Sequence, residues 1–277
     1  MEVIQMIDEV DLCMWAKNGA RYLHQVLKRI DEVIPSRNVN KKIFVDDYSK
    51  DATVEIAKDF SWDVYENEEG YVLGGAKEAL RHVESEFFVS IEQDVLLARS
   101  WWKKIPPHME DPMCMCAQGA RVITSSILTH IDAARWELYQ KLRWASRAPD
   151  RSLDNNLWRT DALRKLGGFP SSCPMYVDNE LYKKVSQTPY KWVVDSTVVS
   201  LHLRENNVLS AGRHVYNVQL LSRRRHQLSA LTILARWAGE TLWSPRVCVY
   251  DSRAFPTYVL LQAYLLKALA IKGLREL

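Results

Sequence analysis

The sequence predicts an α/β fold with a mixed, mostly parallel sheet, followed by a C-terminal helical extension. Three observations support this prediction. Short apolar runs alternate with helical patterns over the first 207 residues, as they do in successive βαβ units. Two of the apolar runs, at 42–45 and 87–91, stop abruptly at acidic residues. From residue 208 onward the apolar spacing is helical.

The elements of the first 207 residues follow from apolar periodicity and from the residue types that begin helices. Short runs rich in apolar residues indicate strands at 11–16, 42–45, 62–66, 87–91, 116–123 and 191–200. Amphipathic spacing indicates helices at 20–32, 53–60, 75–83, 132–144 and from 177 onward. Ser49 and Asp51 are capping residues for the second of these helices. Pro106, Pro107 and Pro112 mark a turn before the fifth strand.

The chain after residue 207 reads as a separate helical region, so the predicted domains are 1–207 and 208–277. Amphipathic helices are expected at 208–225, which ends in three arginines, and at 228–243. The run 257–274 is apolar on nearly every side, but Lys267 interrupts it before the roughly 20 residues that a membrane span requires. This helix is therefore expected either to pack against another subunit, giving a homodimer, or to lie in a membrane interface.

Charge is distributed unevenly between the two predicted domains. Residues 208–277 contain ten basic and three acidic residues, a net charge of +7, whereas the first 207 residues carry 27 basic and 31 acidic residues, or −4. A basic, aromatic tail on an acidic core indicates an anionic partner. The basic residues alternate with long apolar runs, which favours an anionic membrane surface over nucleic acid.

Composition bounds the class of protein further. A chain of 277 residues is long enough for one core and an appendage. The five cysteines show no disulfide framework, and we expect free thiols in a reducing compartment. No basic segment precedes an apolar run at the N-terminus, so no signal peptide is expected. These features predict a cytoplasmic protein, or one peripheral to the cytoplasmic face of a membrane.

The first acidic strand end is Asp46-Asp47. Open α/β sheets bind ligands at the carboxyl ends of their strands, which is where these carboxylates are expected. The alternative interpretation is that Asp47 and Ser49 only cap the following helix.

The second acidic strand end has the spacing Glu92-x-Asp94. Residues two apart on an extended chain point to the same side, so the two carboxylates are expected to share it. Oxygen ligands of this kind suit a divalent cation that also binds phosphate oxygens. An ordinary pair of loop acids is the alternative interpretation.

Five segments resemble, in order and spacing, the family 2 glycosyltransferases of the GT-A fold. The segment 44–53 fits the family's Val-Asp-Asp-x-Ser-x-Asp-x-Thr pattern, and Glu92-Gln93-Asp94 stands where the family has Asp-x-Asp. The segment 157–169 resembles the arginine-plus-Gly-Gly-Phe segment of the family, and 177–181 resembles the acidic helix start that carries the catalytic base. The segment 10–18 looks like the first strand and its nucleotide-binding end.

The resemblance implies a nucleoside-diphosphate sugar as donor and Mg²⁺ or Mn²⁺ as cofactor. Asp94 is implied as a metal ligand, and His202 is a further candidate, although a lone histidine is more often structural. Asp47 would bind the base, and Asp46 would orient the turn or the ribose. The remaining expected donor-binding residues are Lys17, Asn18, Glu92 and Arg159.

On the acceptor side the resemblance implies that Asp178 is the general base of an inverting transfer. The alternative is that Asp178 only caps the helix that follows it. Glu180 would orient the acceptor or an arginine. Gly167 and Gly168 would let the backbone approach the acceptor closely.

The family's processive members carry Gln-x-x-Arg-Trp, but here Ile233 precedes Arg236-Trp237, so transfer of a single sugar is expected. The acceptor is expected to be a hydroxyl or phosphate, either on a polyprenyl-linked lipid or on a glycan. Two alternatives remain open. A sugar nucleotidyltransferase would need a glycine-rich phosphate loop, which residues 14–18 lack, and a membrane-associated scaffold would have lost turnover.

Overall fold

A computed structural model describes residues 7–141, 151–170, 177–210 and 230–246, with scattered positions between 249 and 266. The chain divides into two compact units, which are described separately. The first comprises Met1–Val122 and Pro149–Leu203, and the second comprises Ile123–Ala148 and Arg204–Leu277. The predicted division at residue 207 stays a prediction, since the second unit also takes in an earlier segment of the chain.

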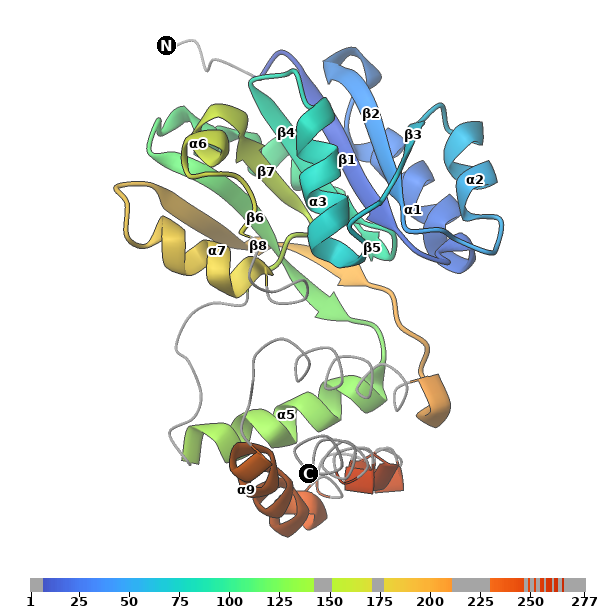
Figure 1. Cartoon of the computed structure of the whole chain (residues 1–277), viewed down its shortest axis with the longest axis vertical. Helices are drawn as coiled ribbons and strands as arrows, with labels where there is room; N and C mark the ends of the chain where they lie inside the picture. Colours follow the sequence, from blue (N-terminus) through green and yellow to red (C-terminus); the bar gives the residue numbers. More distant parts are fainter. Residues whose placement is uncertain are drawn as a thin grey trace. The chain divides into compact units, whose positions relative to one another are not determined.

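The first unit is built on an eight-stranded mixed sheet, which confirms the predicted mixed α/β class (Figure 1). Four strands are mutually parallel and lie in the order β3, β2, β1 and β4. Strand β7 is antiparallel to both β4 and β6, and β5 is antiparallel to β8. The strands are β1 (Val10–Ala16), β2 (Val39–Asp46), β3 (Asp63–Glu66), β4 (Phe87–Glu92), β5 (Val95–Leu96), β6 (Cys114–Ile123), β7 (Asn156–Arg159) and β8 (Lys191–His202).

Helices cover both faces of this sheet. They are α1 (Ala20–Val33), α2 (Thr53–Asp59), α3 (Tyr71–His82), α4 (Trp101–Lys104), α6 (Thr160–Lys165) and α7 (Val177–Val185), with 3₁₀ turns η1 (Ser36–Asn38) and η2 (Pro106–Glu110). The proline-marked segment is therefore partly helical. The helix predicted at 75–83 begins earlier, at Tyr71, and its Gly74 and Gly75 lie close against Asn67 and Trp15. Strands β5 and β7 were not predicted from the sequence.

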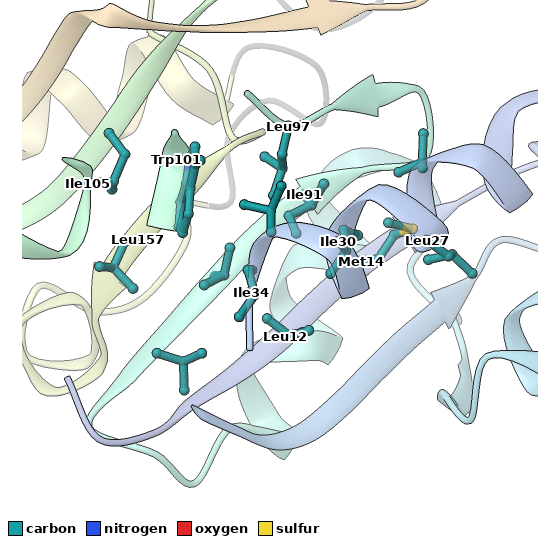
Figure 2. Close-up of a cluster of buried hydrophobic side chains, with 14 of the residues drawn as sticks. Leu12, Met14, Leu27, Ile30, Ile34, Ile91, Leu97, Trp101, Ile105 and Leu157 are labelled. Carbon is teal, nitrogen blue, oxygen red and sulfur yellow. The ribbon is translucent and has the colours of Figure 1, made fainter. Parts of the chain in front are cut away.

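Alternation along the central strands divides the interior into two apolar clusters. Leu12 and Met14 of β1 face the cluster that α1 covers, and Cys13 and Trp15 face the cluster that α3, α6 and α7 cover. Figure 2 shows the first cluster, where side chains of α1 lie over β1 and β4, and Trp101 lies beside the strands. Burial on both sides explains why β1 reads as a nearly continuous apolar run.

The cysteines within the described residues are free thiols, as predicted. Burial raises the pKa of the Cys13 and Cys116 thiols well above the usual value, and that of Cys114 to about 11. These thiols therefore stay protonated and behave as core residues. Cys173 and Cys248 lie outside the described residues.

The second unit contains α5 (Ser126–Lys141), α9 (Ala230–Trp243) and the short η3 (Ser244–Arg246). Helix α5 starts six residues before its predicted beginning at 132, and its predicted end at 144 lies outside the described residues. Tyr258 is fully buried beside Ile131, and its hydroxyl donates to the Glu240 carbonyl over 2.9 Å. Residues 211–225, including the three arginines, and most of 257–274 lie outside the described residues. In the part that is described, no helix is long and apolar enough to cross a membrane.

Asp11 fixes the amino-terminal end of the sheet from inside the protein. Its carboxylate is fully buried. It accepts hydrogen bonds from the backbone N–H groups of Glu84 and Ser85, at 2.6 and 2.9 Å, and from Asn40 Nδ2 at 3.0 Å. These bonds join β1 to the segment that leads into β4.

Replacing Asp11 with alanine is expected to lower the free energy of unfolding by about 3 kcal/mol, because two backbone donors are left unpaired in the interior. Urea denaturation of Asp11→Ala measures this loss. Asp8→Ala is the matched control, since Asp8 is exposed three residues earlier, and it should change stability by less than about 0.5 kcal/mol. Equal stabilities for the two variants would contradict the role of Asp11.

Candidate functional site

The acidic strand ends meet at one edge of the sheet. Strands β2, β1 and β4 are parallel neighbours, and the register pairs Ala16 with Asp46 and Trp15 with Glu92. The carboxyl ends of the three strands therefore lie side by side, as the sequence predicted. In open α/β sheets this edge is the usual ligand site.

Asp46 and Asp47 play different parts at the end of β2. Asp46 is buried, and its Oδ2 accepts from the Ser49 N–H over 2.9 Å, so it orients the turn. Its Oδ1 is also buried and accepts no hydrogen bond from the described residues. Asp47 Oδ2 contacts Lys17 Nζ at 3.1 Å, and 56% of the Lys17 side chain is exposed. Lys17 and Asp47 thus form a charged pair beside the carboxyl ends of β1 and β2.

The segment after β1 is held by the turn after β2. The Asn18 N–H donates to Ser49 Oγ over 2.8 Å, and Asn18 Oδ1 accepts from the Lys50 N–H over 2.7 Å. The Gly19 N–H, at the start of α1, donates to Thr53 Oγ1 over 2.7 Å. Asn18 adopts a left-handed backbone, with φ of 50°, which asparagine tolerates well. The two loops therefore form one fixed unit.

Asp51 strengthens the same contact. Partial burial opposes ionisation of its carboxyl group, but hydrogen bonds from the Thr53 side chain and N–H and from the Ala20 N–H outweigh this, so the pKa of Asp51 lies below its usual value. The residue at the N-cap position of α2 is Ala52, but the Asp51 carboxylate binds N–H groups at the start of both α2 and α1. The other predicted cap, Ser49, instead binds the segment after β1.

Glu92, Asp94 and His202 form a cluster suited to a metal ion. One potential ligand atom from each lies within 4.8 Å of the others, and His202 Nε2 is 3.3 Å from Asp94 Oδ1. The position of Asp94 is set by its backbone, because its carbonyl accepts from the Leu203 N–H over 2.8 Å, and Val95 pairs with His202 in the sheet. Asp94 and His202 are buried. Two carboxylates and one imidazole fit Mn²⁺ or Mg²⁺ as a ligand set.

The structure does not bring Arg159 to this edge. It pairs with Phe87 at the start of β4, five residues, or about 16 Å, from Glu92. Its guanidinium is bound to Glu86, at 3.0 Å, and to the Met109 carbonyl, at 2.7 Å. The expected contact of this arginine with donor phosphate is therefore not supported, and Arg159 instead joins β7 to neighbouring segments at the far end.

Gly167 and Gly168 end helix α6. Both have positive φ, at 91° and 72°, and the Gly168 N–H donates to the Leu163 carbonyl over 2.9 Å, as in a glycine C-cap. The turn sends Phe169 onto Trp15, with ring centroids 6.4 Å apart in an edge-to-face arrangement. Since Trp15 is the register partner of Glu92, this segment does approach the edge.

Asp178 and Glu180 lie in the first turn of α7 and are both partly exposed. Val177 and Leu181 of the same helix are buried in the cluster that contains Trp158 of β7 and Trp192 of β8. Helix α7 therefore covers the half of the sheet formed by β7, β6 and β8. The position of both acids at the start of a helix is as predicted.

Two residues at the site escaped the sequence interpretation. Gln93 Oε1 accepts from the Lys17 N–H over 2.8 Å, and its Nε2 donates to the Lys17 carbonyl over 3.2 Å. Trp15 is buried beside Glu92, and its Nε1 donates no hydrogen bond within the described residues. Gln93 is the variable position of the acidic motif, and Trp15 resembles an ordinary core residue, so neither carried a signal.

An α/β fold whose acidic side chains gather at the carboxyl ends of its parallel strands is typical of nucleotide-binding proteins. The sequence agrees: the model of the family described as glycosyl transferase family 2 matches residues 11–167, more than half of the chain. The chain therefore belongs to this family and is a glycosyltransferase. Comparison with curated protein sequences gives no match.

Solved structures share the fold at low sequence identity. The mannosyltransferase PcManGT from Pyrobaculum calidifontis, in complex with GDP-Man and Mn²⁺, is 17% identical with a TM-score of 0.63, over 98% of this chain and 88% of that one. Glucosyl-3-phosphoglycerate synthase from Mycobacterium tuberculosis, in complex with Mn²⁺, UDP and phosphoglyceric acid, is 15% identical with a TM-score of 0.56, covering 79% and 78%. S. aureus TarS 1-349 with UDP-GlcNAc is 16% identical with a TM-score of 0.53, covering 82% and 66%.

Removing the Gln93 side chain is expected to loosen the segment after β1. Gln93→Ala loses two hydrogen bonds of about 1 kcal/mol each, so exchange of the Lys17 amide hydrogen should accelerate about tenfold or more. Hydrogen exchange followed by NMR measures this rate. Gln25→Ala, at an exposed glutamine on α1, is the control. An unchanged exchange rate at the Lys17 amide in Gln93→Ala would show that Gln93 does not hold this segment.

Proposed function

We propose that the protein is an inverting, metal-dependent glycosyltransferase that moves one sugar from a nucleoside-diphosphate sugar to an acceptor hydroxyl or phosphate. The observation that carries the proposal is the cluster of Glu92, Asp94 and His202 at the same edge as the Asp46-Asp47 turn. A metal-bound diphosphate and a nucleoside fit this pairing of sites.

The nucleoside end of the donor is assigned to the carboxyl ends of β1 and β2. Asp47 would accept from a base N–H, and Asp46, whose Oδ1 is buried and accepts no hydrogen bond from the described residues, would orient the turn or the ribose. Lys17 and the Asn18 segment, both clasped by neighbouring loops, would flank the phosphates. Lys17 can exchange its contact with Asp47 for a phosphate, because more than half of its side chain is exposed.

Glu92, Asp94 and His202 would hold Mn²⁺ or Mg²⁺. The bound ion would stabilise the negative charge that develops on the departing diphosphate. The PcManGT and glucosyl-3-phosphoglycerate synthase complexes both contain Mn²⁺, which supports this choice of metal. The residues fit the ion because two of the three side chains offer carboxylate oxygens within reach of one centre.

Asp178 is proposed as the general base. At the start of α7 its carboxylate would take the proton of the acceptor hydroxyl while that oxygen attacks the anomeric carbon from the side opposite the diphosphate. A single displacement of this kind inverts the anomeric configuration. Glu180, two residues on in the same first turn, would orient the acceptor, and the Gly167-Gly168 turn would bring Phe169 to the acceptor side.

Replacing Asp94 with asparagine is expected to abolish metal-dependent transfer and to weaken donor binding sharply, because a carboxylate charge on the cation is lost. Calorimetric titration of GDP- and UDP-sugars in the presence of Mn²⁺ measures the binding. Asp59→Asn, an exposed acid at the end of α2, is the control. Unchanged metal-dependent affinity in Asp94→Asn would overturn the assignment, and absence of nucleoside-diphosphate release by the wild type would favour the non-catalytic alternative.

Replacing Asp178 with asparagine is expected to leave donor affinity nearly intact and to lower turnover by about 10²-fold or more, the usual scale for a general base. Steady-state kinetics at saturating donor measure the turnover. Asp161→Asn, an exposed acid in the first turn of α6, should retain full activity. A large loss of donor binding with preserved turnover would show that Asp178 serves the donor.

We further propose that the helical unit holds the enzyme peripherally on the cytoplasmic face of an anionic membrane, near a lipid-linked acceptor. Leu234 and Leu242 of α9 are 47% and 84% exposed at a spacing that places them on one helix face. Residues 208–277 carry a net charge of +7, and each basic residue near an anionic surface adds about 1 kcal/mol of attraction. Buried free thiols support a reducing compartment.

Membrane association is expected to depend on salt and on lipid charge. Co-sedimentation should recover the protein with phosphatidylserine-containing vesicles at low salt, and little of it with neutral vesicles or at high salt. Replacing both Leu234 and Leu242 with glutamine should reduce recovery, whereas Val199→Gln, at an exposed apolar residue of β8 outside the helical unit, is the control. Absence of binding to either vesicle, with a solution dimer that the Leu234/Leu242 variant disrupts, would instead establish a subunit interface.

A further inference from the structure

A buried ion pair at the end of β6 takes no part in the site described so far. Arg121 Nη1 contacts Asp154 Oδ2. The Asp154 side chain is fully buried, whereas 23% of the Arg121 side chain is exposed. A buried pair contributes little net stability, because desolvation of two charges offsets their attraction. The main consequence of the pair is therefore that it fixes the position of the Arg121 guanidinium.

Asp154 is itself fixed by a chain of buried hydrogen bonds. Ser152 Oγ donates to Asp154 Oδ1 over 2.7 Å, and Gln118 Nε2 donates to Ser152 Oγ over 3.1 Å. Trp192 Nε1 in turn donates to Gln118 Oε1 over 2.9 Å. The interior of the sheet thus sets the position of Arg121, and such a preorganised arginine loses little freedom on binding a ligand.

The strand register places this pair at the edge that carries the metal ligands. One row across the sheet joins Ser90 of β4, Asn156 of β7 and Gln118 of β6. Glu92 lies two residues after Ser90 on β4. Asp154 lies two residues before Asn156, and because β7 runs antiparallel to β4, it lies on the same side of this row as Glu92. The pair is therefore level with the end of β4.

Arg121 lies on the side of Glu92 away from the nucleoside, on a strand between those that carry Glu92 and His202. The Asp46-Asp47 turn is two strands from β4 in one direction, and β6 is two strands from β4 in the other, about 10 Å at the usual strand spacing. A donor whose nucleoside lies over β2 and β1 and whose diphosphate lies near Glu92 would place its sugar, and then the acceptor, towards β7 and β6. Helix α7, with Asp178, covers the same half.

We propose that Arg121, positioned by Asp154, binds an anionic group of the acceptor, a phosphate or a carboxylate. The inference rests on the proposed function and names the acceptor class for it. An arginine fork binds both kinds of oxyanion in a bidentate manner. On the nucleoside side of the edge Lys17 pairs with Asp47, and at the end of β4 lie the carboxylates of Glu92 and Asp94. Arg121 would supply a fixed cation on the β6 side, where an anionic acceptor needs one.

The test measures binding of small anions to the protein saturated with nucleoside diphosphate and Mn²⁺. Glycerol 3-phosphate or glycerate should bind by calorimetry, and neutral glycerol should not. Arg121→Ala should weaken this binding at least about tenfold, the scale of one charge-assisted contact, and Arg121→Lys should weaken it less. Asp154→Asn should also weaken it. Arg99→Ala, at an exposed arginine paired with Glu32, should leave it unchanged.

Two arms separate the sources of the anionic group. Arg121-dependent binding of the small anions supports a free anionic acceptor, whereas Arg121-dependent binding only to phosphatidylcholine vesicles containing phosphatidic acid supports a lipid phosphate. Binding that is independent of Arg121 in both arms overturns the inference. Loss of nucleotide binding in Arg121→Ala also overturns it, because the arginine would then serve the donor.

The proposed function and this inference fail differently. If the wild type binds no nucleoside diphosphate with Mn²⁺, the proposed function fails. If it binds the nucleotide but none of the anions, only the inference fails. Circular dichroism and thermal unfolding show whether each variant folds. If Asp154→Asn does not fold, the two Arg121 variants still decide the question.

Discussion

The crossing from β4 to β5 is the constraint on which the rest of the site depends. These strands follow one another in the chain with only two residues between them, yet β7, β6 and β8 lie between them in the sheet. The crossing is possible only if the sheet curls until the ends of β4 and β8 approach each other. The backbone bond from Leu203 to Asp94 and the pairing of Val95 with His202 hold that closure. Glu92, Asp94 and His202 come together as a result.

The two halves of the sheet carry different groups of polar residues. The parallel half, from β3 to β4, places every strand's carboxyl end at one edge, where the turns after β1 and β2 clasp each other through Asn18 and Gly19. The half containing β7, β6 and β8 carries the Arg121–Asp154 pair and is covered by α7. In the proposed function, a donor would extend from the first half to the second.

Buried polar side chains give this sheet its fixed geometry. Asp11 anchors the amino-terminal end, and Asn155, with φ of 56°, anchors the opposite end of β7. Asn155 Oδ1 accepts from Trp101 Nε1 over 2.9 Å, and its Nδ2 donates to the Gly119 carbonyl over 2.8 Å. Such satisfied networks favour one arrangement over others, since any shift leaves a buried group unpaired.

The sequence by itself determined the α/β class, most of the strands, and the acidic ends of β2 and β4, because burial on two faces and capping chemistry are local properties. It also indicated Asp94 and His202 as candidate ligands of one metal ion. Only the tertiary structure showed that these two side chains lie 3.3 Å apart and that Gln93 holds Lys17. It also placed Arg159 at the far end of the sheet and buried Asp154 against Arg121. Each of these depends on strand order and register between residues 33 or more positions apart, which no local pattern encodes, because the pairing energy is realised only when the whole sheet has formed.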